Sequence, residues 1–330
     1  MAPQSAQPSR PRPWWLIHAL TAATCWGIWG VLAKGPSREL SGWMTQILFT
    51  FALVPSALVA ALSPQVRMGT NKPRGLFWGF VSGLLAAGGN LAFYLALENG
   101  ADTAVAVPLT NIYPLVTIAI AWLFFRERLN AIQIAGIGVA VVAIVLLSGE
   151  AGSLGDPAAF FHRLGLNAWM GYTFTAMLFW GVFSATQKIS TNHVSAELSY
   201  LAWCAAFIPI AIWIVATKEL KWNMPAAMLW SGLAAGALNG FGVIAAFAAY
   251  RAEGKASIVT PLAAAVQPVV TVVLALIFLG ERIGGLEVAG VVLAIAAAVA
   301  LSFETRNATP AGPGSSPPST TDRHEGPPHV

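Results

Sequence analysis

Charged residues are scarce in this sequence of 330 residues. Only 14 acidic and 18 basic side chains are present, which makes 10% of the chain charged, whereas a soluble domain carries about 25%. Because 56% of the residues are hydrophobic, a soluble fold of this length would expose large apolar patches to water. The composition therefore excludes a soluble globular protein and indicates a protein that is integral to a lipid bilayer.

Cysteine and paired metal ligands are also sparse. The two cysteines, Cys25 and Cys204, lie far apart within apolar runs, which excludes a disulfide framework and the spacing of a zinc site. The five histidines are scattered and show no metal-ligand spacing. We therefore expect no metal, no cofactor and no enzymatic activity. The net charge of +4 is small and spread over short segments, so we also expect no nucleic-acid partner.

Ten apolar segments of about 20 residues, the length of a membrane-spanning helix, alternate with clusters of charge and proline. None of the first nine contains an Asp, Glu, Lys or Arg in its interior, and the tenth contains only Glu287 near its start. Because every backbone group in lipid needs a partner within the protein, these segments must be helices. The predicted fold is an all-α integral membrane protein with ten transmembrane helices at 14–33, 43–62, 75–97, 104–125, 130–148, 169–187, 199–217, 225–250, 257–279 and 284–303.

Lysine and arginine are distributed unevenly between the connecting segments. If the N-terminus is cytoplasmic, twelve of the 18 basic residues lie on the cytoplasmic side, which agrees with the positive-inside rule. We expect a multi-pass protein of the cell membrane with both termini in the cytoplasm. Residues 1–13 would form a cytoplasmic segment and 149–168 an extracytoplasmic linker, while 304–330, rich in Pro, Ser and Gly, would form a disordered cytoplasmic tail.

The sequence repeats itself at an offset of 154 residues. CWGIWGVLAK in the first span aligns with FWGVFSATQK in the sixth, and the Glu-Arg pairs at 127–128 and 281–282 align as well. The halves, 14–148 and 169–303, hold five spans each, and an odd number of spans reverses the orientation of the second half. Inverted repeats of this kind are typical of secondary transporters, whose substrate site lies between the halves. The matched pairs include Trp26 with Trp180, Gly27 with Gly181, Lys34 with Lys188 and Gly136 with Gly290.

Several short motifs recur in the same order in both halves. CWG near the start of the first half is followed by VPLTNIYP, FFRERL and Gly136, and FWG in the second half is followed by TPLAAAVQP, FLGERI and Gly290. In this order the motifs resemble the ten-helix, EamA-type branch of the drug/metabolite transporter superfamily. The resemblance covers about residues 15–148 and 168–303. It implies two five-helix EamA repeats and a transport function, and it is uninformative about the substrate.

The paired prolines are candidates for hinges. Pro108 and Pro114 in span four, and Pro261 and Pro268 in span nine, each remove a backbone donor, and broken helices usually line a cavity. We expect both spans to bend at these prolines during transport, with nearby polar groups facing a central pathway. The alternative is a structural kink whose polar side chains bond to adjacent helices.

Polar and aromatic side chains within the spans are candidates for substrate contact, because a small-molecule pocket combines stacking faces with a few hydrogen-bonding groups. The candidates are Trp26, Asn90, Asn111, Tyr113, Trp180, Asn239 and Gln267. For any one of them, helix packing is the alternative. Spans five and ten are nearly uniform in Ala, Val, Ile and Leu, so they are predicted to face lipid or a second subunit in a homodimer.

Charged residues at the ends of spans give two further predictions. Lys34 and Lys188 are repeat-related and end spans one and six, where they act either as snorkelling anchors or as cationic gates at the two mouths of a pathway. The Glu-Arg pairs at 127–128 and 281–282 are expected to be exposed local ion pairs that set a turn, each contributing ~0–1 kcal/mol.

No carboxylate lies deep within a span, and this disfavours proton exchange with a cation. The small multidrug resistance relatives carry a glutamate eight residues before a lysine, and Trp26 and Trp180 stand at those positions here. No Lys or Arg lies mid-membrane either, which disfavours an obligate anion. We therefore predict a secondary transporter that works by alternating access and exports a small neutral or amphiphilic metabolite or drug. The alternatives are a structural or signalling membrane protein, and a proton-coupled cation exporter with an unrecognised coupling residue.

Overall fold

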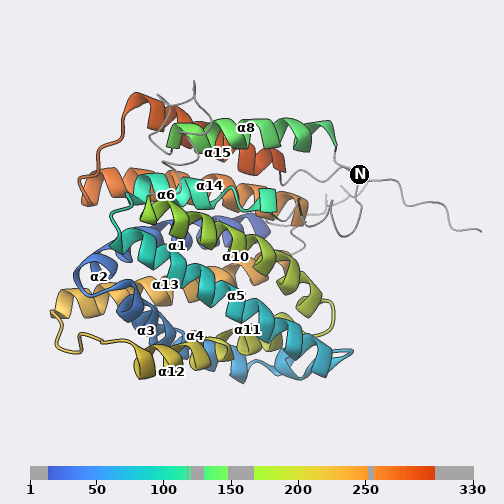
Figure 1. Cartoon of the computed structure of the whole chain (residues 1–330). Coiled ribbons are helices and arrows are strands. Elements are labelled where there is room, and N and C mark those ends of the chain that lie inside the picture. Colours follow the sequence, from blue (N-terminus) through green and yellow to red (C-terminus); the bar gives the residue numbers. More distant parts are fainter. Residues whose placement is uncertain (1–13, 117–118, 120–129, 148–166, 252–255, 302–330) are drawn as a thin grey trace, which may run out of the picture.

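The computed structural model describes residues 14–116, 119, 130–147, 167–251 and 256–301, and its named elements are all helices (Figure 1). The all-α fold class predicted from the sequence is confirmed. The first half contains α1 (Trp14–Leu32), α2 (Lys34–Glu39), α3 (Gly42–Ala52), α4 (Val54–Leu62), the 3-10 helix η1 (Pro64–Arg67), α5 (Lys72–Glu98), α6 (Thr103–Thr110) and α8 (Ala131–Leu147). The second half contains α10 (Ala168–Thr191), α11 (Ala196–Ala205), α12 (Phe207–Thr217), α13 (Ala226–Arg251), α14 (Ala256–Phe278) and α15 (Gly285–Leu301).

Among the described residues, five helical stretches are long and apolar enough to cross a membrane. They are Trp14–Glu39, Gly42–Leu62, Lys72–Glu98, Ala196–Thr217 and Ala226–Ala246. Four further helices are apolar but shorter, at Thr103–Val116, Ala131–Leu147, Ala265–Phe278 and Gly285–Leu301. The number of membrane crossings, ten in the sequence analysis, stays a prediction.

A two-fold pseudo-symmetry relates the two halves. A methyl group added to Gly27 of α1 would lie 2.7 Å from Cβ of Val270 on α14, and one added to Gly181 of α10 would lie 2.5 Å from Cβ of Val116. Each residue of the second pair stands 154 positions from its counterpart in the first. In the first contact the glycine belongs to the first half and the valine to the second, and in the second contact these places are reversed. A rotation of 180° that exchanges the halves therefore exchanges the two contacts.

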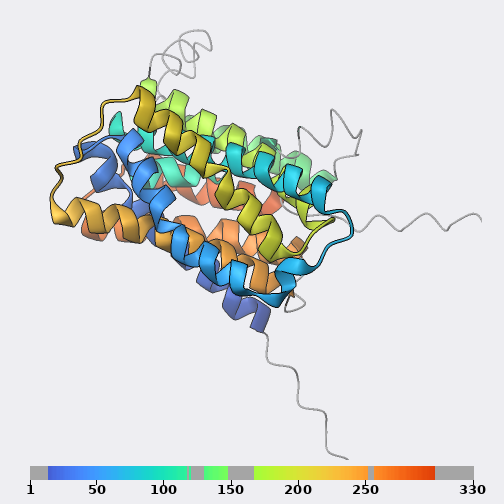
Figure 2. The same ribbon diagram turned by 90° about the horizontal axis from the view of Figure 1, so that it is seen from below.

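The same reciprocity holds elsewhere in the bundle. Gly136 of α8 lies against Leu301 of α15, and its repeat equivalent Gly290 lies against Leu147. These glycines let α8 and α15 approach closely, since a side chain at either position would overlap the facing helix. Figure 1 shows these two helices side by side at one edge of the bundle, with α3, α4, α11 and α12 at the opposite edge. Figure 2, turned by 90°, shows the helices of both halves crossing one another along the bundle.

Prolines interrupt two repeat-related spans in the same way. α3 and α4 meet at Leu53, and α11 and α12 meet at Ala206. Pro55 and Pro209 follow these junctions and stand 154 residues apart. Each proline lacks the donor that would continue the helix through the junction. These breaks belong to the symmetric part of the fold.

The other proline pair breaks this symmetry. α6 ends at Thr110, and helical backbone resumes only at Pro114, whereas α14 continues past Pro268 to Phe278. Between the two helical pieces, Tyr113 donates to the Thr110 carbonyl at 3.0 Å, a bond three residues long where an α-helix has four. The interruption predicted for both spans is therefore observed in span four and is not observed at Pro268 in span nine.

An aromatic cluster fills the centre, where the halves meet. Trp29 of α1 lies with its ring centroid 5.2 Å from Phe93 of α5 and 5.8 Å from Trp180 of α10, and the last two rings are 5.8 Å apart. The indole of Trp29 donates a hydrogen bond of 3.0 Å to the hydroxyl of the fully buried Tyr94. Rings at these separations attract one another beyond their burial, so the cluster ties α1, α5 and α10 together.

The paired helices α8 and α15 bury small residues against each other and turn large apolar residues outward. Ala140 and Ala297 are fully buried, whereas Val141 and Val292 are more than half exposed. An outward face of this composition suits contact with lipid. The homodimer predicted through these two spans stays a prediction.

Candidate functional site

The predicted substrate-contacting residues fall into two groups in the fold. Trp26, Asn239 and Gln267 lie on α1, α13 and α14, and α1 packs against both of the other helices. The second group lies on α5, α10 and the segment that follows α6, and α10 packs against α5 and α6. The members of the second group are Asn90, Asn111, Tyr113 and Trp180. The pseudo-two-fold exchanges the helices of one group with those of the other.

The two repeat-related tryptophans occupy equivalent places. The indole of Trp26 is seated on the bare backbone of Gly242 in α13, and the indole of Trp180 is seated on Gly89 in α5. A side chain at either glycine would overlap the ring. Both tryptophans are half-buried, so each keeps part of its aromatic surface free of close packing. Asn90 follows Gly89 directly in the sequence and is buried.

Asn111 and Gln267 differ in their surroundings. The amide nitrogen of Asn111, a buried residue, donates to the Val107 carbonyl of its own helix at 2.9 Å. Gln267 is half-buried, and its backbone carbonyl accepts a bond of 3.1 Å from Thr271, whose hydroxyl also lies 3.0 Å from the carbonyl of Gly27. The amide of Asn111 is thus already bonded within the protein, while Gln267 stands where α14 is linked to α1.

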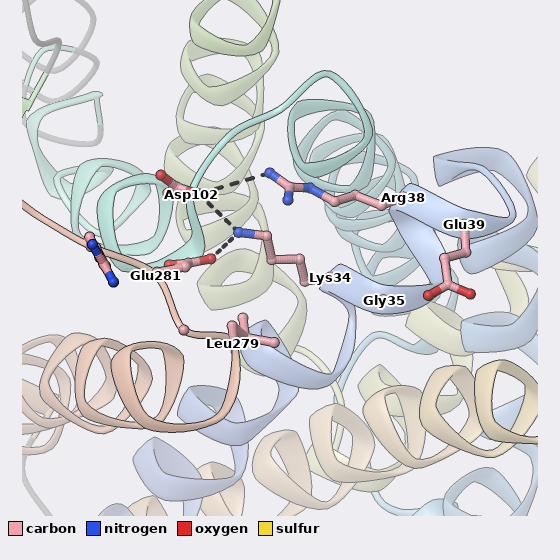
Figure 3. A pocket seen from close by; sticks show the side chains of 9 residues that line it. Lys34, Gly35, Arg38, Glu39, Asp102, Leu279 and Glu281 are labelled. Carbon is pink, nitrogen blue, oxygen red and sulfur yellow. Dashed lines mark hydrogen bonds and ion pairs between the residues drawn. The ribbon is translucent and has the colours of Figure 1, made fainter.

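A cluster of charged residues lies at one end of the bundle and lines a pocket of 630 Å³ (Figure 3). Nζ of Lys34 lies 3.0 Å from the carboxylate of Asp102 and forms a second ion pair with Glu281. Arg38 approaches Asp102 at 3.8 Å. In Figure 3 the side chain of Glu39 points away from this cluster. The pocket is lined by Lys34, Gly35, Arg38, Glu39, Asp102, Leu279, Gly280, Glu281 and Arg282.

Glu281 caps a helix that lies far from it in sequence. Its two carboxylate oxygens accept hydrogen bonds of 2.9 Å and 2.8 Å from the backbone N–H groups of Thr103 and Ala104, the first residues of α6. Asp102 occupies the N-cap position of α6 but makes no side-chain cap bond, since its carboxylate is turned to Lys34. A carboxylate at this place satisfies free N–H donors and is stabilised by the helix dipole.

The local sequence explains how Glu281 reaches α6. α14 ends at Phe278, and Gly280 adopts a φ of 64°, a left-handed conformation that glycine adopts without strain and that commonly ends helices. The backbone N–H of Glu281 then folds back to the Ala275 carbonyl at 3.4 Å. The first repeat has Arg126 at the position equivalent to Gly280, so the glycine that favours this turn is present in the sequence of one half only.

Two predictions about these charges are corrected by the structure. Lys34 is not a snorkelling anchor, because its side chain is only 6% exposed and its amine lies between two carboxylates. Glu281 does not form an exposed pair with Arg282, because its carboxylate is 3% exposed and directed at Lys34 and α6. Local spacing could not predict the ion pair of Lys34 with Glu281, because the two residues stand 247 positions apart. The side chains of Lys188 and Pro261 and the pair at 127–128 lie outside the described residues.

Four buried polar atoms have no hydrogen-bond partner among the described residues. Both amide atoms of Gln46, the hydroxyl of Thr103 and the indole nitrogen of Trp203 form this set. Gln46 is fully buried on α3, where an unpaired amide is costly. Its repeat equivalent is Tyr200, whose hydroxyl lies 2.7 Å from that of Ser56. Repeat-related positions therefore differ in whether the polar group is paired.

Comparison with known proteins identifies the fold and the family. A solved crystal structure of a protein shares the fold with a TM-score of 0.56 at 19% identity, covering 87% of this chain and 96% of that one. The uncharacterized protein MJ1333.1 of Methanocaldococcus jannaschii is 37% identical over 73 residues, or 22% of this chain, and the chain spans about half (53%) of the length of this curated relative. The EamA-like transporter family matches twice, over residues 13–149 and 167–303. The chain therefore belongs to the EamA-like transporter family of the drug/metabolite transporter superfamily, whose members are multi-pass membrane transporters and not enzymes.

Proposed function

We propose that the protein moves its substrate by alternating access, with the two halves exchanging conformations. The observation that supports this is the asymmetry of the two proline-containing spans. α6 is interrupted between Thr110 and Pro114 while α14 continues past Pro268, although the surrounding contacts obey the pseudo-two-fold. Two copies of one structural unit that hold different conformations can exchange them, and the exchanged state exposes the opposite side of the membrane.

We propose a small neutral or amphiphilic metabolite or drug as the substrate. The candidate contacts consist of half-buried indoles and amide side chains, with Trp26 and Trp180 in equivalent places on the two halves. Aromatic faces with few hydrogen-bonding groups suit a molecule of low charge. The charges described near this region are gathered at one end of the bundle and neutralise one another.

We also propose the cell membrane as the location, with both termini cytoplasmic and export as the direction of transport. The excess of lysine and arginine on one side of the predicted spans supports this orientation. The exposed apolar faces of α8 and α15 would then contact lipid or the same face of a second copy. A reporter that is active only outside the membrane, fused after Val330, should give no signal. A strong signal would contradict the orientation.

The buried carboxylate of Glu281 bears on the alternative of a proton-coupled cation exporter. A coupling carboxylate must be able to exchange its proton for substrate. Glu281 is instead held by one amine and two backbone N–H groups, so its charge is already compensated. The structure therefore favours the neutral substrate over this alternative.

Uptake of radioactive candidates into everted membrane vesicles tests the proposed function. We expect accumulation of a neutral or amphiphilic compound that is lost in the Trp26→Ala and Trp180→Ala variants, and binding that is insensitive to moderate salt because few fixed charges face the substrate. Each uptake is measured with and without an imposed pH gradient. Binding that collapses between low and moderate salt would show that a charged site holds the substrate, and a strict requirement for the pH gradient with a cationic substrate would favour the proton-coupled exporter.

A further inference from the structure

We propose that Glu281 is the central residue of an ionic latch that keeps one mouth of the transport pathway closed in this conformation. The latch is defined by Lys34, Asp102 and Glu281, together with the backbone N–H groups at the start of α6. The proposal rests on the alternating-access function proposed above and adds to it the residues that control access at this end. Glu281 does not belong to the predicted substrate-contacting residues, so its role in the latch is separate from substrate binding.

The latch joins the two halves of the protein. Glu281 belongs to the second half, at the turn between α14 and α15, whereas Lys34, Thr103 and Ala104 belong to the first. One carboxylate of the second half thus binds both the start of α2 and the start of α6. Because each of these bonds crosses from one half to the other, the halves cannot separate at this end until all of them are broken.

An apolar plug lies directly behind the latch. Val31, Ala104 and Ala275 are buried together, and they come from α1, α6 and α14. Val31 precedes Lys34 by less than one helical turn, and Ala104 donates its N–H to Glu281. The carbonyl of Ala275 accepts the backbone N–H of Glu281. Each residue of the plug is therefore bonded to a residue of the latch or lies within one helical turn of it. Opening the latch would expose the plug.

The helices that the latch holds are the two that carry the asymmetry. α6 contains Pro108 and ends before Pro114, and α14 contains Pro268, and the two helices pack against each other. A change in either proline segment moves the start of α6 relative to the end of α14, the two points that Glu281 connects. The latch is placed where the proposed exchange of conformations has to act.

The surroundings of the latch allow it to open reversibly. Lys34 and Glu281 are almost fully buried, but the side chain of Asp102 is 46% exposed and the adjoining pocket has a volume of 630 Å³. Water can therefore reach the separated charges and replace their lost bonds, which lowers the cost of separating them. A pair without such access would be a permanent structural link.

The latch is tested by the chemical accessibility of the plug. The reporter is Ala275→Cys, a small change at a fully buried position, placed in a background in which Cys25 and Cys204 are replaced by Ser. Open membrane fragments, accessible from both sides, are treated with a small uncharged maleimide. Because the reagent carries no charge, removing the charge of Glu281 does not change its electrostatic attraction to the protein. We expect Glu281→Gln to raise the labelling rate by about tenfold or more, since loss of one partner strongly destabilises a buried ion pair.

Two matched controls separate a latch from general damage. Glu39→Gln removes the same charge from the same pocket, but Glu39 takes part in no ion pair with a described residue, so we expect less than about a twofold change, as for a surface substitution. Ala140→Cys reports on the buried α8–α15 contact and should stay unlabelled with Glu281→Gln. Equal labelling of both reporters would overturn the proposal, because it would mean that the whole bundle had loosened.

A second variant keeps the test decisive if Glu281→Gln folds poorly. Lys34→Met with Glu281→Gln removes both buried charges, and the carboxylate of Asp102 that remains is 46% exposed and lies 3.8 Å from Arg38. We expect the Ala275→Cys reporter to be labelled as fast in this double variant as in a folded Glu281→Gln variant. Labelling as slow as in the protein with Lys34 and Glu281 intact would overturn the latch. Because labelling requires no substrate, an unchanged rate in a variant that still transports refutes the latch alone. A raised rate without transport of any candidate supports the latch and counts against the proposed substrate class.

Discussion

Replacing Pro114 and Pro268 by alanine should push the protein toward opposite conformations. In the present conformation span four is broken at Pro114 and span nine is continuous past Pro268. The pseudo-two-fold predicts that the exchanged conformation has span four continuous and span nine broken. Pro114→Ala returns a backbone donor that can bond the Thr110 carbonyl, which favours a continuous span four and hence the exchanged conformation. Pro268→Ala removes the preference for a break in span nine and favours the present one.

The size of the shift follows from the cost of proline within a helix. That cost is about 3 kcal/mol relative to alanine, and every 1.4 kcal/mol changes a population ratio tenfold. The shift therefore has an upper limit of about 100-fold in each direction. The observed change will be smaller, because the bond of Tyr113 to Thr110 must be broken when the helix is restored. Both substitutions should slow turnover, since each makes one conformation harder to leave.

The reporter Ala275→Cys measures the shift directly. We expect Pro114→Ala to raise its labelling rate and Pro268→Ala to lower it or leave it at the protected level. Pro55→Ala and Pro209→Ala are the matched controls, because they lie at breaks that are symmetric in the two halves and should not favour either conformation. If Pro114→Ala and Pro268→Ala both raise the labelling rate, or if the control pair acts as strongly, the exchange of conformations between the halves is the wrong mechanism.

Three further predictions concern packing and substrate contact. Gly136→Ala should lower the thermal unfolding midpoint in detergent, since overpacking against α15 costs ~1–3 kcal/mol, whereas Gly138→Ala, whose added methyl group would meet no described atom within 4 Å, should raise it; equal effects would contradict the close approach of α8 and α15. Gln46→Leu should stabilise the protein by ~1–3 kcal/mol because it removes a buried amide that has no hydrogen-bond partner in the described part of the chain, and a loss of stability would show that the amide is bonded after all. Gln267→Ala should reduce uptake at near-normal stability, whereas Asn111→Ala should also lose ~1 kcal/mol with its bond to its own helix; normal uptake in both variants would remove these residues from the site.

The repeat offset was the most informative feature of the sequence for the fold. A shift of 154 residues predicts which residues occupy equivalent positions, and the contacts of Gly27 and Gly181 follow it. The helices themselves were predictable because apolar segments in lipid have no other way to satisfy their backbone. The breaks at Leu53 and Ala206 were not predicted, although Pro55 and Pro209 carried the signal.

The proposed latch could not be predicted from sequence patterns, because its residues are distant in the sequence. Glu281 was interpreted through its neighbour Arg282, because local spacing is what a sequence displays. Its partners stand 247 and 178 residues away, and two of its bonds are to backbone N–H groups that any residue could supply. The one local signal was Gly280, which ends α14 in a left-handed turn and has Arg126 as its counterpart in the first half.

Under the proposed alternating access, the repeat symmetry and the departures from it together explain how one sequence would adopt two conformations. Several close contacts recur in both halves, so a state in which span four is broken and a state in which span nine is broken would have similar packing and similar free energy. Departures from the repeat then decide which state is favoured. Gly280 and Glu281 bind the end of α14 to the start of α6, and the sequence has Arg126, not glycine, at the position equivalent to Gly280. The proposed latch therefore stabilises the present conformation through residues at one end of the bundle rather than through the predicted substrate-contacting residues, and under the proposed alternating access the protein would have a preferred resting state in the absence of substrate.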